Sequence, residues 1–444
     1  MMRFRPRSGA HILYNLALGT ALFASFPVWI PWMAMSHRRR SNFLDRLGLR
    51  LKNVPAASGK ERVWIHAVSV GETLSAVPLV RMLRKRKPDA EILFSTVTIT
   101  GQEAAVKALG VETDARFYFP FDLPGIAGKF LDRVRPDAVV ILETEIWPNF
   151  LAECFDRGIP AMIVNGRISG RSFRGYARFR FFFSRVLACI TAITAQTEED
   201  ARRFLALGAR PLTVTVTGNM KFDIESPAAG QTPLMALMGG EKTSGTRWFI
   251  AGSTHEGEEA AVLHAFTEGR SVNGSLKLLL APRHPERFAA VEELCRQNGW
   301  DVARKTAILH ESGKKLPDVI LLDTMGELPS AYAAADIAFV GGSLVPKGGH
   351  NILEPALYGV PTIVGPHMEN FREIADIFSV AGAIRQVGGP SELSSLIARW
   401  AADPSVEIET GRKARELLSA FRGATERNVA VVEHALDLRR RRKD

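Results

Sequence analysis

The feature that most constrains the fold of this chain is an alternation of short apolar runs with longer helical patterns, which begins near residue 62. The runs lie at 63–69, 92–98, 138–142, 161–164, 193–196 and 214–217, and then at 248–251, 278–280, 319–322, 337–340 and 362–364. Almost all of their residues are apolar, as expected of parallel strands that helices cover on both faces. The pattern therefore predicts two doubly wound, Rossmann-like α/β domains, with ligands bound in the cleft between them.

The length of the chain, 444 residues, also favours two domains, because a single core rarely grows to that size. Between residues 221 and 246 the alternation stops, and Pro, Gly, Ser and Lys replace the apolar runs. We therefore expect an N-terminal domain over 41–225, a linker over 226–246 and a C-terminal domain over 247–444. The tail from residue 407 onward is typical of one or two helices that end in a basic, solvated run.

The N-terminal segment differs from the rest of the chain. Residues 12–36 contain no Asp, Glu, Lys, Arg or His, and arginines flank them at positions 3, 5 and 7 and at 38–40. About 20 apolar residues can cross a bilayer, so residues 1–40 are expected to anchor the chain to a membrane, with the remainder on the cytoplasmic side. A cleaved signal peptide is disfavoured, because the arginines follow the run directly without a small-x-small site.

Whether this anchor spans the bilayer or lies in its interface stays open, because Asn15, Gly19, Pro27 and Pro31 weaken a span. The amphipathic stretch 43–52 that follows is expected either to lie near lipid headgroups or to be a solvated linker helix.

The charge balance favours anionic partners. The chain has 57 Lys and Arg against 47 Asp and Glu, a net charge of +10, which suits an anionic membrane face or acidic substrates. Its basic clusters lack zinc-finger spacing and RNA-binding aromatic strands, so no nucleic acid partner is expected. The three cysteines, Cys154, Cys189 and Cys295, lie far apart, which indicates buried thiols in a reducing compartment.

Glu72 is the first candidate for chemistry. It lies in His66–Thr73 (HAVSVGET), which leaves the first predicted strand and opens a helix whose N-terminus favours an anion. An ionised carboxylate in a cleft can accept the proton of an attacking hydroxyl. The alternative is that Glu72 only caps the helix.

Two further loops of the first domain carry charged candidates. In Glu143–Asn149 (ETEIWPN) we expect Glu143 and Glu145 to have different roles, one facing the cleft and one capping the helix that begins near Pro148. A polar loop beside a core tryptophan is the alternative. Lys221, in Thr217–Asp223 (TGNMKFD), can offset charge on a leaving group, or it is simply solvated.

The second domain holds the longest motif, Gly341–Pro355 (GGSLVPKGGHNILEP), which runs from a strand through four glycines into a helix. It predicts a phosphate-binding nest, with Glu354 placed to hold ribose hydroxyls, and a structural glycine turn is the alternative. Neither a Walker lysine–serine pair nor a G-x-G-x-x-G pattern is present, which argues against an NTPase and a dehydrogenase.

Three other loops of this domain, 252–258, 281–287 and 323–328, are expected to complete the nucleotide site. Arg283 either pairs with a phosphate or forms a surface ion pair, and His255 and His284 are either ligands or satisfied polar groups. No Asp-x-Asp follows a strand, and no His, Cys and Asp cluster has metal-ligand spacing. We therefore expect metal-independent chemistry.

Taken in order, the N-terminal apolar segment and the motifs HAVSVGET, ETEIWPN, TGNMKFD, STHEGEE, PRHPERF, DTMGEL and GGSLVPKGGHNILEP resemble the bacterial 3-deoxy-D-manno-octulosonic acid (Kdo) transferases, which have the two-domain GT-B fold. The resemblance covers nearly the whole chain. It implies transfer of Kdo from CMP-Kdo to the glucosamine disaccharide of a lipid A precursor (lipid IVA), at the cytoplasmic side of the inner membrane, with no cofactor.

Carried over residue by residue, the resemblance implies that Glu72 is the general base and that Glu143 and Lys221 stabilise the transition state. It also implies contacts with CMP from Pro282, Arg283, Met325, Gly326, Glu327, Asn351, Ile352, Leu353 and Glu354, with Met325 and Ile352 acting through their backbone. Pro346-Lys347 and the weakly patterned segment after Asp223 depart from the family pattern, and both bear on loop closure.

The implied mechanism is a single displacement that inverts the anomeric carbon, with cationic groups and helix termini in place of a metal. Two other classes of protein stay open. A nucleotide-sugar epimerase shares the architecture but needs neither a lipid acceptor nor a membrane segment. A lipid-phosphate-binding protein at the membrane surface would bind lipid A without releasing CMP.

Overall fold

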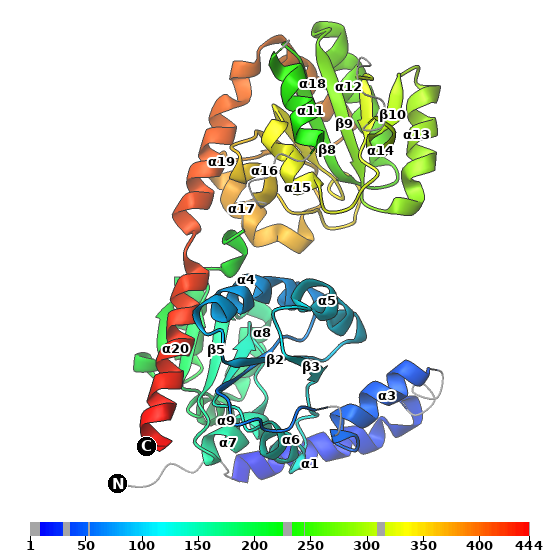
Figure 1. The fold of residues 1–444 in the computed structure, drawn as a ribbon. Coiled ribbons are helices and arrows are strands. Elements are labelled where there is room, and N and C mark those ends of the chain that lie inside the picture. The colour runs from blue at the N-terminus through cyan, green and yellow to red at the C-terminus, as the bar shows by residue number, and fades with distance from the viewer. Residues whose placement is uncertain are drawn as a thin grey trace. The chain divides into compact units, whose positions relative to one another are not determined.

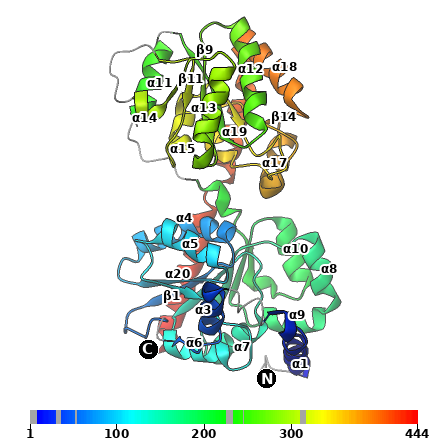
Figure 2. The same ribbon diagram turned by 90° about the vertical axis from the view of Figure 1, so that its right-hand side faces the viewer.

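The computed structural model describes residues 9–29, 36–51, 54–224, 233–243, 245–308 and 316–443. Its contacts divide the chain into two compact units. The first consists of Met1–Asp223 together with Phe421–Asp444, and the second is Ile224–Ala420. Each unit has its own parallel sheet with helices packed on it (Figures 1 and 2). The fold class of two Rossmann-like α/β domains is therefore confirmed.

Within the described residues, the sheet of the first unit has seven strands in the order β3-β2-β1-β4-β5-β6-β7. They are β1 (Arg62–His66), β2 (Glu91–Thr96), β3 (Ala115–Tyr118), β4 (Ala138–Leu142), β5 (Ala161–Gly166), β6 (Ala192–Ala195) and β7 (Val214–Val216). Successive side chains enter opposite faces: Trp64 is buried in one core cluster, and Val63 and Ile65 in the other. Because both faces are covered, nearly every strand position is apolar. The chain order reverses between β1 and β4, which makes the ends of these strands a topological switch point.

Helices cover both faces of this sheet. They are α1 (Gly9–Ala24), α3 (His37–Arg46), α4 (Val70–Arg86), α5 (Ile99–Leu109), α6 (Ile126–Val134), α7 (Pro148–Asp156), α8 (Gly170–Arg178), α9 (Arg180–Leu187), α10 (Glu198–Ala206) and α20 (Ala424–Lys443), with short 3₁₀ turns η2 (Pro211–Thr213) and η3 (Met220–Phe222). The predicted buried thiols are confirmed: Cys154 and Cys189 lie in this unit and Cys295 in the second, and all are buried and free.

The last helix of the chain, α20, belongs to the first unit, whereas the sequence pattern placed residues 247–444 in the second. Val429, Val432 and Leu436 recur at helical spacing and are buried in the same cluster as Val63 and Ile65. This apolar stripe covers part of the first sheet, as Figure 1 shows for the red helix beside β5. The predicted division of the tail into helices is confirmed by α19 (Ile408–Phe421) and α20.

Within the described residues, the sheet of the second unit also has seven parallel strands, in the order β10-β11-β9-β8-β12-β13-β14. They are β8 (Arg247–Thr254), β9 (Leu276–Pro282), β10 (Val302–Arg304), β11 (Val319–Leu321), β12 (Ile337–Val340), β13 (Thr362–Val364) and β14 (Arg385–Gln386). Trp248 and Ile250 are buried on one face, and Phe249 and Ala251 on the other. Here the chain order reverses between β8 and β12, so the loops after these strands meet at the switch point.

The helices of the second unit are α11 (Pro233–Thr243), α12 (Glu258–Val272), α13 (Phe288–Gln297), α14 (Lys305–Ile308), α15 (Leu328–Ala331), α16 (Leu353–Leu357), α17 (Arg372–Val380), α18 (Pro390–Ala402) and α19, with 3₁₀ turns η4 (Pro285–Arg287), η5 (Tyr332–Ala334), η6 (Glu369–Phe371) and η7 (Pro404–Glu407). Part of the predicted linker 226–246 is folded, because Leu234 and Met238 of α11 are buried beside Trp248. Residues 225–232 and 244 lie outside the described residues.

Every predicted strand is present, and three short ones were not predicted. These are β3, β10 and β14, and each lies at an edge of its sheet. An edge strand is covered on fewer sides, so it can carry charged residues such as Arg116, Arg304 and Arg385 and gives no apolar run.

The N-terminal helix α1 packs on the first unit through polar side chains. His11 Nε2 lies 2.8 Å from Asn149 Oδ1, and the Tyr14 hydroxyl donates to Asp122 at 2.9 Å. The apolar side chains of Ile12, Leu13, Leu16 and Phe23 are exposed. Within the described part of the chain, no helix has the length and apolarity needed to cross a bilayer. The rest of the predicted anchor, residues 1–8 and 30–35, lies outside the described residues.

Candidate active site

Glu72 is held in place at the switch point of the first unit. It sits in the first turn of α4, which Ser69 caps. Its Oε2 accepts a hydrogen bond from the Val68 N–H at 2.7 Å, and its Oε1 accepts one from the Ser69 hydroxyl at 2.8 Å. Burial raises the pKa of Glu72, the two hydrogen bonds act to lower it, and the charge of Glu143 raises it further. Glu72 therefore takes part in capping α4 and remains partly exposed, so the capping role does not exclude a role in proton transfer.

Glu143 follows β4, the strand beside β1. Its φ of 56° is left-handed, which a non-glycine residue rarely adopts. Its carboxylate pairs with Arg167, with 3.3 Å between Oε2 and Nε. The charge of Glu143 raises the pKa of Glu72, so the two carboxylates lie within electrostatic reach of each other.

Glu145 completes a group of three carboxylates. Burial raises its pKa to about 7, and the charges of Glu72 and then Glu143 raise it as well. Neither glutamate caps the next helix, so that expectation is wrong. The N-terminus of α7 is instead capped by the buried Asp122, which accepts hydrogen bonds from the N–H groups of Asn149 and Phe150 at 3.1 and 2.8 Å. The helix begins at Pro148, as predicted.

Lys221 lies in η3, which packs against α4 through the buried Met220. Two side-chain amides fix this turn: Asn165 Oδ1 accepts from the Met220 N–H, and Asn219 Oδ1 accepts from the Lys221 N–H. Lys221 therefore belongs to a segment that contacts the helix carrying Glu72.

One histidine and one tryptophan of these motifs, His66 and Trp147, pack in the first unit. His66 is fully buried, stacks on Phe119 with ring centroids 3.7 Å apart, and has its Nδ1 3.1 Å from the Ser95 carbonyl oxygen. Burial lowers its pKa to about 3. Trp147 packs against the core of the first unit. Trp147 is partly buried, so its packing is compatible with either reading of the ETEIWPN segment.

In the second unit, the backbone N–H groups of the glycine segment after β12 bind a side chain of the protein itself. The buried carboxylate of Glu258, in the first turn of α12, accepts hydrogen bonds from the N–H groups of Gly342, Ser343 and Leu344 at 2.7, 3.0 and 2.8 Å. The prediction that these N–H groups form a phosphate nest is therefore wrong. Their role is structural, because Glu258 also accepts from the His255 N–H at 2.9 Å and so joins the loops after β8 and β12.

The residues implied to contact CMP form two neighbouring groups. Glu354, at the start of α16, accepts a hydrogen bond from Asn351 at 3.1 Å. Burial raises the pKa of Glu354 to about 7, against the effects of that bond and of the positive charge of Arg283. Arg283 follows the buried Pro282 at the end of β9. Ile352 and Leu353 are buried, which leaves their backbone as the part able to reach a ligand.

The second group, Met325, Gly326 and Glu327, lies between β11 and α15, and β11 is next to β9 in the sheet. Met325 is exposed, and Gly326 has a φ of 90° with open space where a side chain would be. The Glu327 carboxylate accepts a hydrogen bond from Lys305 at 2.8 Å. The loop 325–327 therefore exposes its backbone at Gly326, and the Glu327 carboxylate is already paired with Lys305.

Three histidines gather at the switch point of this unit. His255 Nε2 lies 2.9 Å from His350 Nε2, and the His284 ring meets the His255 ring edge-on with centroids 5.2 Å apart. His255 and His284 were candidates from the sequence, whereas His350 was not predicted. The only sequence feature that pointed to His350 was its position in the glycine motif KGGHN. The partners Arg167, Lys305 and Glu258 were missed as well, because each acts across a long sequence separation.

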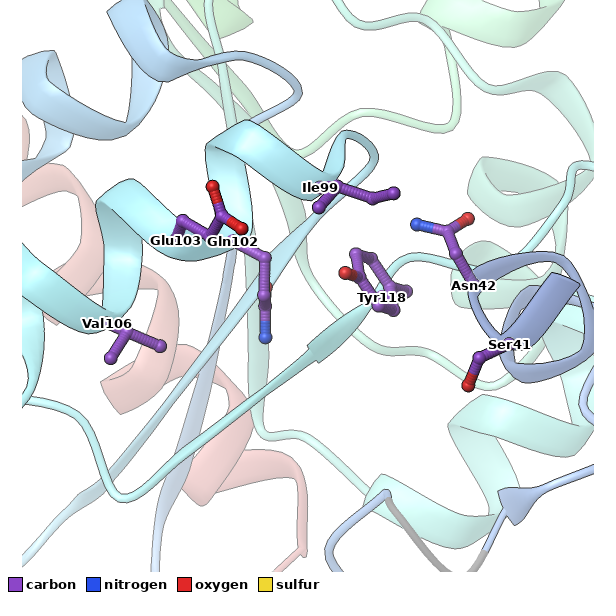
Figure 3. Close-up of a pocket in the computed structure, with 7 residues that line it drawn as sticks. All are labelled: Ser41, Asn42, Ile99, Gln102, Glu103, Val106 and Tyr118. Carbon is purple, nitrogen blue, oxygen red and sulfur yellow. The ribbon is translucent and has the colours of Figure 1, made fainter. Parts of the chain in front are cut away.

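A separate pocket of about 440 Å³ lies in the first unit (Figure 3). It is lined by Ser41, Asn42, Ile99, Gln102, Glu103, Val106 and Tyr118, from α3, α5 and the end of β3. The N-cap of α5, Thr98, donates to the carbonyl of Val68 at 3.3 Å, so this wall of the pocket adjoins the loop that carries Glu72. Among the described residues, no group of three or more His, Cys, Asp or Glu is arranged to hold a metal ion.

A family model described as 3-deoxy-D-manno-octulosonic-acid transferase (Kdo transferase) matches residues 42–224. The 3-deoxy-D-manno-octulosonic acid transferase of Haemophilus influenzae is 35% identical over 404 residues, 90% of this chain and 93% of the relative. That of Bordetella pertussis is 35% identical over 418 residues, 91% and 95% of the two chains.

Among solved structures, the UDP-GlcNAc 2-epimerase of Neisseria meningitidis bound to UDP-GlcNAc gives a TM-score of 0.52 at 13% identity, covering 85% of this chain and 99% of that one. This likeness is one of fold alone. The fold class is that of a two-domain α/β protein, with acidic residues at one switch point and basic loops at the other. The sequence relationship decides the family: the chain belongs to the 3-deoxy-D-manno-octulosonic acid transferase family, and it is a glycosyltransferase.

Proposed function

We propose that this enzyme transfers Kdo from CMP-Kdo to the glucosamine disaccharide of a lipid A precursor and inverts the anomeric carbon. The relatives named above are Kdo transferases, which supports the transferred sugar. The observation that carries the chemistry is the carboxylate of Glu72, oriented by two hydrogen bonds beside Glu143 at a switch point.

The proposed step is a single displacement. An acceptor hydroxyl oxygen attacks the anomeric carbon of Kdo, and its proton passes to a carboxylate oxygen of Glu72. The bond between that carbon and the phosphate oxygen breaks, and CMP leaves with the electron pair. Lys221 and Arg283 are proposed to offset the negative charge that develops on CMP, so the reaction needs no metal ion.

The donor is assigned to the second unit. Asn351, Glu354 and Arg283 lie within electrostatic reach of one another, and they present an amide, a carboxyl group and a guanidinium at one end of the sheet. The amide and the carboxyl group suit ribose hydroxyls, and the guanidinium suits phosphate oxygens. The backbone at Gly326 adds an open edge for the base.

The acceptor sugars are assigned to the pocket of Figure 3. Its lining combines amides and hydroxyls, from Asn42, Gln102, Ser41 and Tyr118, with the exposed apolar side chain of Val106. This mixture suits the hydroxyl-bearing edges and apolar faces of a disaccharide. The variant Gln102→Ala is then expected to raise the KM for the lipid acceptor and to leave the KM for CMP-Kdo unchanged.

We also propose that α1 holds the enzyme at the cytoplasmic face of the inner membrane, lying in the interface. Its polar side packs on the first unit, while Ile12, Leu13, Leu16 and Phe23 remain exposed. An exposed apolar helix face on a protein with a net charge of +10 favours binding to an anionic membrane leaflet.

The decisive experiment is incubation of the purified protein with CMP-Kdo and a tetraacylated lipid A precursor, followed by mass spectrometry of the lipid. We expect the lipid to gain the mass of one or more Kdo residues and CMP to be released, with the same result in EDTA. Lipid bound without any gain in mass would favour the lipid-binding protein, and epimerised UDP-GlcNAc would favour the epimerase. Activity that is lost in EDTA and restored by Mg²⁺ would refute the metal-free mechanism.

A further inference from the structure

The second unit contains a pair of histidines, His255 and His350, whose Nε2 atoms lie within hydrogen-bond distance of each other. His255 Nε2 and His350 Nε2 are 2.9 Å apart, and their rings are parallel within 2°. A hydrogen bond between two imidazole nitrogens needs a proton on one of them and a lone pair on the other. The pair can therefore accept one additional proton and keep this bond, but it cannot accept two.

The backbone fixes this pair in place. Glu258 accepts from the N–H groups of both His255 and Gly342, so the loops after β8 and β12 are held together. A Cβ at Gly342 would lie 3.0 Å from the His350 ring and 3.4 Å from the His255 ring. With φ at 66°, this position requires glycine on conformational grounds as well. The fold thus fixes the two loops that carry the rings.

The surroundings of the pair are positively charged. For His255, burial and the charges of His284, Lys347, Arg283 and Arg287 lower the pKa. For His350, burial and then His255, Arg283 and His284 lower the pKa to about 4. Both imidazoles are therefore neutral at neutral pH in a site where further positive charge is unfavourable.

The acidic groups of the same loops are committed elsewhere. Glu258 is bound by backbone N–H groups, and Glu259 pairs with Arg287 at 3.2 Å. Glu256 also pairs with Arg287, Glu286 lies 3.7 Å from His284, and Glu354 accepts from Asn351. The positive potential at the histidine pair is therefore available to an external anion.

We infer that the His255–His350 pair, with Arg283, binds an oxyanion of the donor substrate and takes up one proton from solvent as the anion binds. The inference rests on the proposed function and deepens it, since it names a binding and charge-neutralising role for two residues to which the resemblance assigns no role. A protonated pair carries an N–H on each Nδ1 in addition to the shared proton, so it offers two donors and one positive charge. The phosphate and the sugar carboxylate are the two oxyanions that a CMP-linked sugar acid supplies.

Calorimetric titration of the full-length protein with CMP tests this inference. At pH about 7.5, where the phosphate is already fully ionised, the heat is measured in two buffers of different ionisation enthalpy. We expect uptake of roughly one proton per CMP, and an affinity that falls by up to about tenfold per pH unit as the pH rises. His350→Gln is expected to abolish the uptake and weaken CMP binding at least about tenfold. A parallel titration with free Kdo shows whether the carboxylate is the oxyanion instead.

Two matched variants sharpen the test. His264→Gln changes a histidine of the same unit whose ring bonds Ser394 instead, and it should behave as the wild type. His284→Gln should retain the proton uptake; if it loses the uptake while His350→Gln keeps it, the pair is not the acceptor. If the wild type transfers Kdo and binds CMP, but neither CMP nor Kdo brings in a proton, the inference fails and the proposed function stands. If the wild type neither binds CMP nor transfers Kdo, the proposed function fails with it.

Discussion

The hydroxyl of Ser69 donates a hydrogen bond to the carboxylate of Glu72, with 2.8 Å between Oγ and Oε1. Together with the bond from the Val68 N–H, it fixes the orientation of the carboxylate and stabilises its ionised form against burial. A proton acceptor needs both properties, because it must meet the attacking hydroxyl in the ionised state.

Replacing Glu72 should remove the proton acceptor with little change in the fold. Glu72→Gln keeps the shape of the side chain, and we expect kcat for Kdo transfer to fall by about 10² to 10⁴. Glu198→Gln is the matched control, since Glu198 is an exposed first-turn glutamate of α10. Near-wild-type turnover of Glu72→Gln would disprove the assignment of the base.

Ser69→Ala should shift the pH dependence of transfer. The hydroxyl lowers the pKa of Glu72, so its removal raises that pKa, and the acid limb of the kcat/KM profile moves to higher pH. The variant also loses the cap of α4, which costs about 1 kcal/mol in the free energy of unfolding. An unshifted acid limb would show that another group controls it.

Glu145→Gln should stabilise the protein at alkaline pH. The folded-state pKa of Glu145, about 7, lies above its ordinary value of 4.5, so ionisation in the folded protein is unfavourable. The destabilisation is absent below pH 4.5, grows as the pH rises to about 7, and is complete above it, at up to about 3 kcal/mol. The Tm gain of the variant over the wild type should therefore be larger at pH 8 than at pH 5. Equal gains at both pH values would contradict the raised pKa.

Asp223 should control the attachment of α20. Its carboxylate accepts hydrogen bonds from the N–H groups of Gly423 and Thr425, where the chain returns to the first unit. Asp223→Ala is expected to lower the free energy of unfolding by about 0.5–2 kcal/mol and to speed amide exchange in α20. Asp437→Asn, at an exposed position of the same helix, serves as the control and should leave both measurements unchanged.

The two faces of α1 should respond differently to substitution. Leu16→Asp changes an exposed apolar residue, so it should weaken binding to anionic phospholipid vesicles and leave Tm within about a degree. His11→Ala removes the partner of Asn149 from a buried contact and should lower Tm instead. Unaltered vesicle binding by Leu16→Asp would argue against the interfacial role of this face.

Much of the architecture could be predicted from the sequence because it depends on local pattern. A strand that is covered on both faces must be apolar throughout, so the central strands of both sheets were visible as runs. The ends of those runs also located Glu72, Glu143, Arg283 and Glu354 in the segments that follow the carboxyl ends of the strands. The charged edge strands β3, β10 and β14 carried no such pattern.

What the sequence by itself determined is therefore the fold class, the family and the loops that carry the chemistry, since each is encoded in neighbouring residues. Only the tertiary structure decided which hydrogen-bond donors and acceptors pair with each other. Glu258 fills the glycine segment more than eighty residues away, Asp122 takes the capping role expected of a glutamate, and His255 meets His350. Backbone N–H groups and buried charges bind whichever partner the packed chain brings near, and that choice depends on distances in space that no local pattern records.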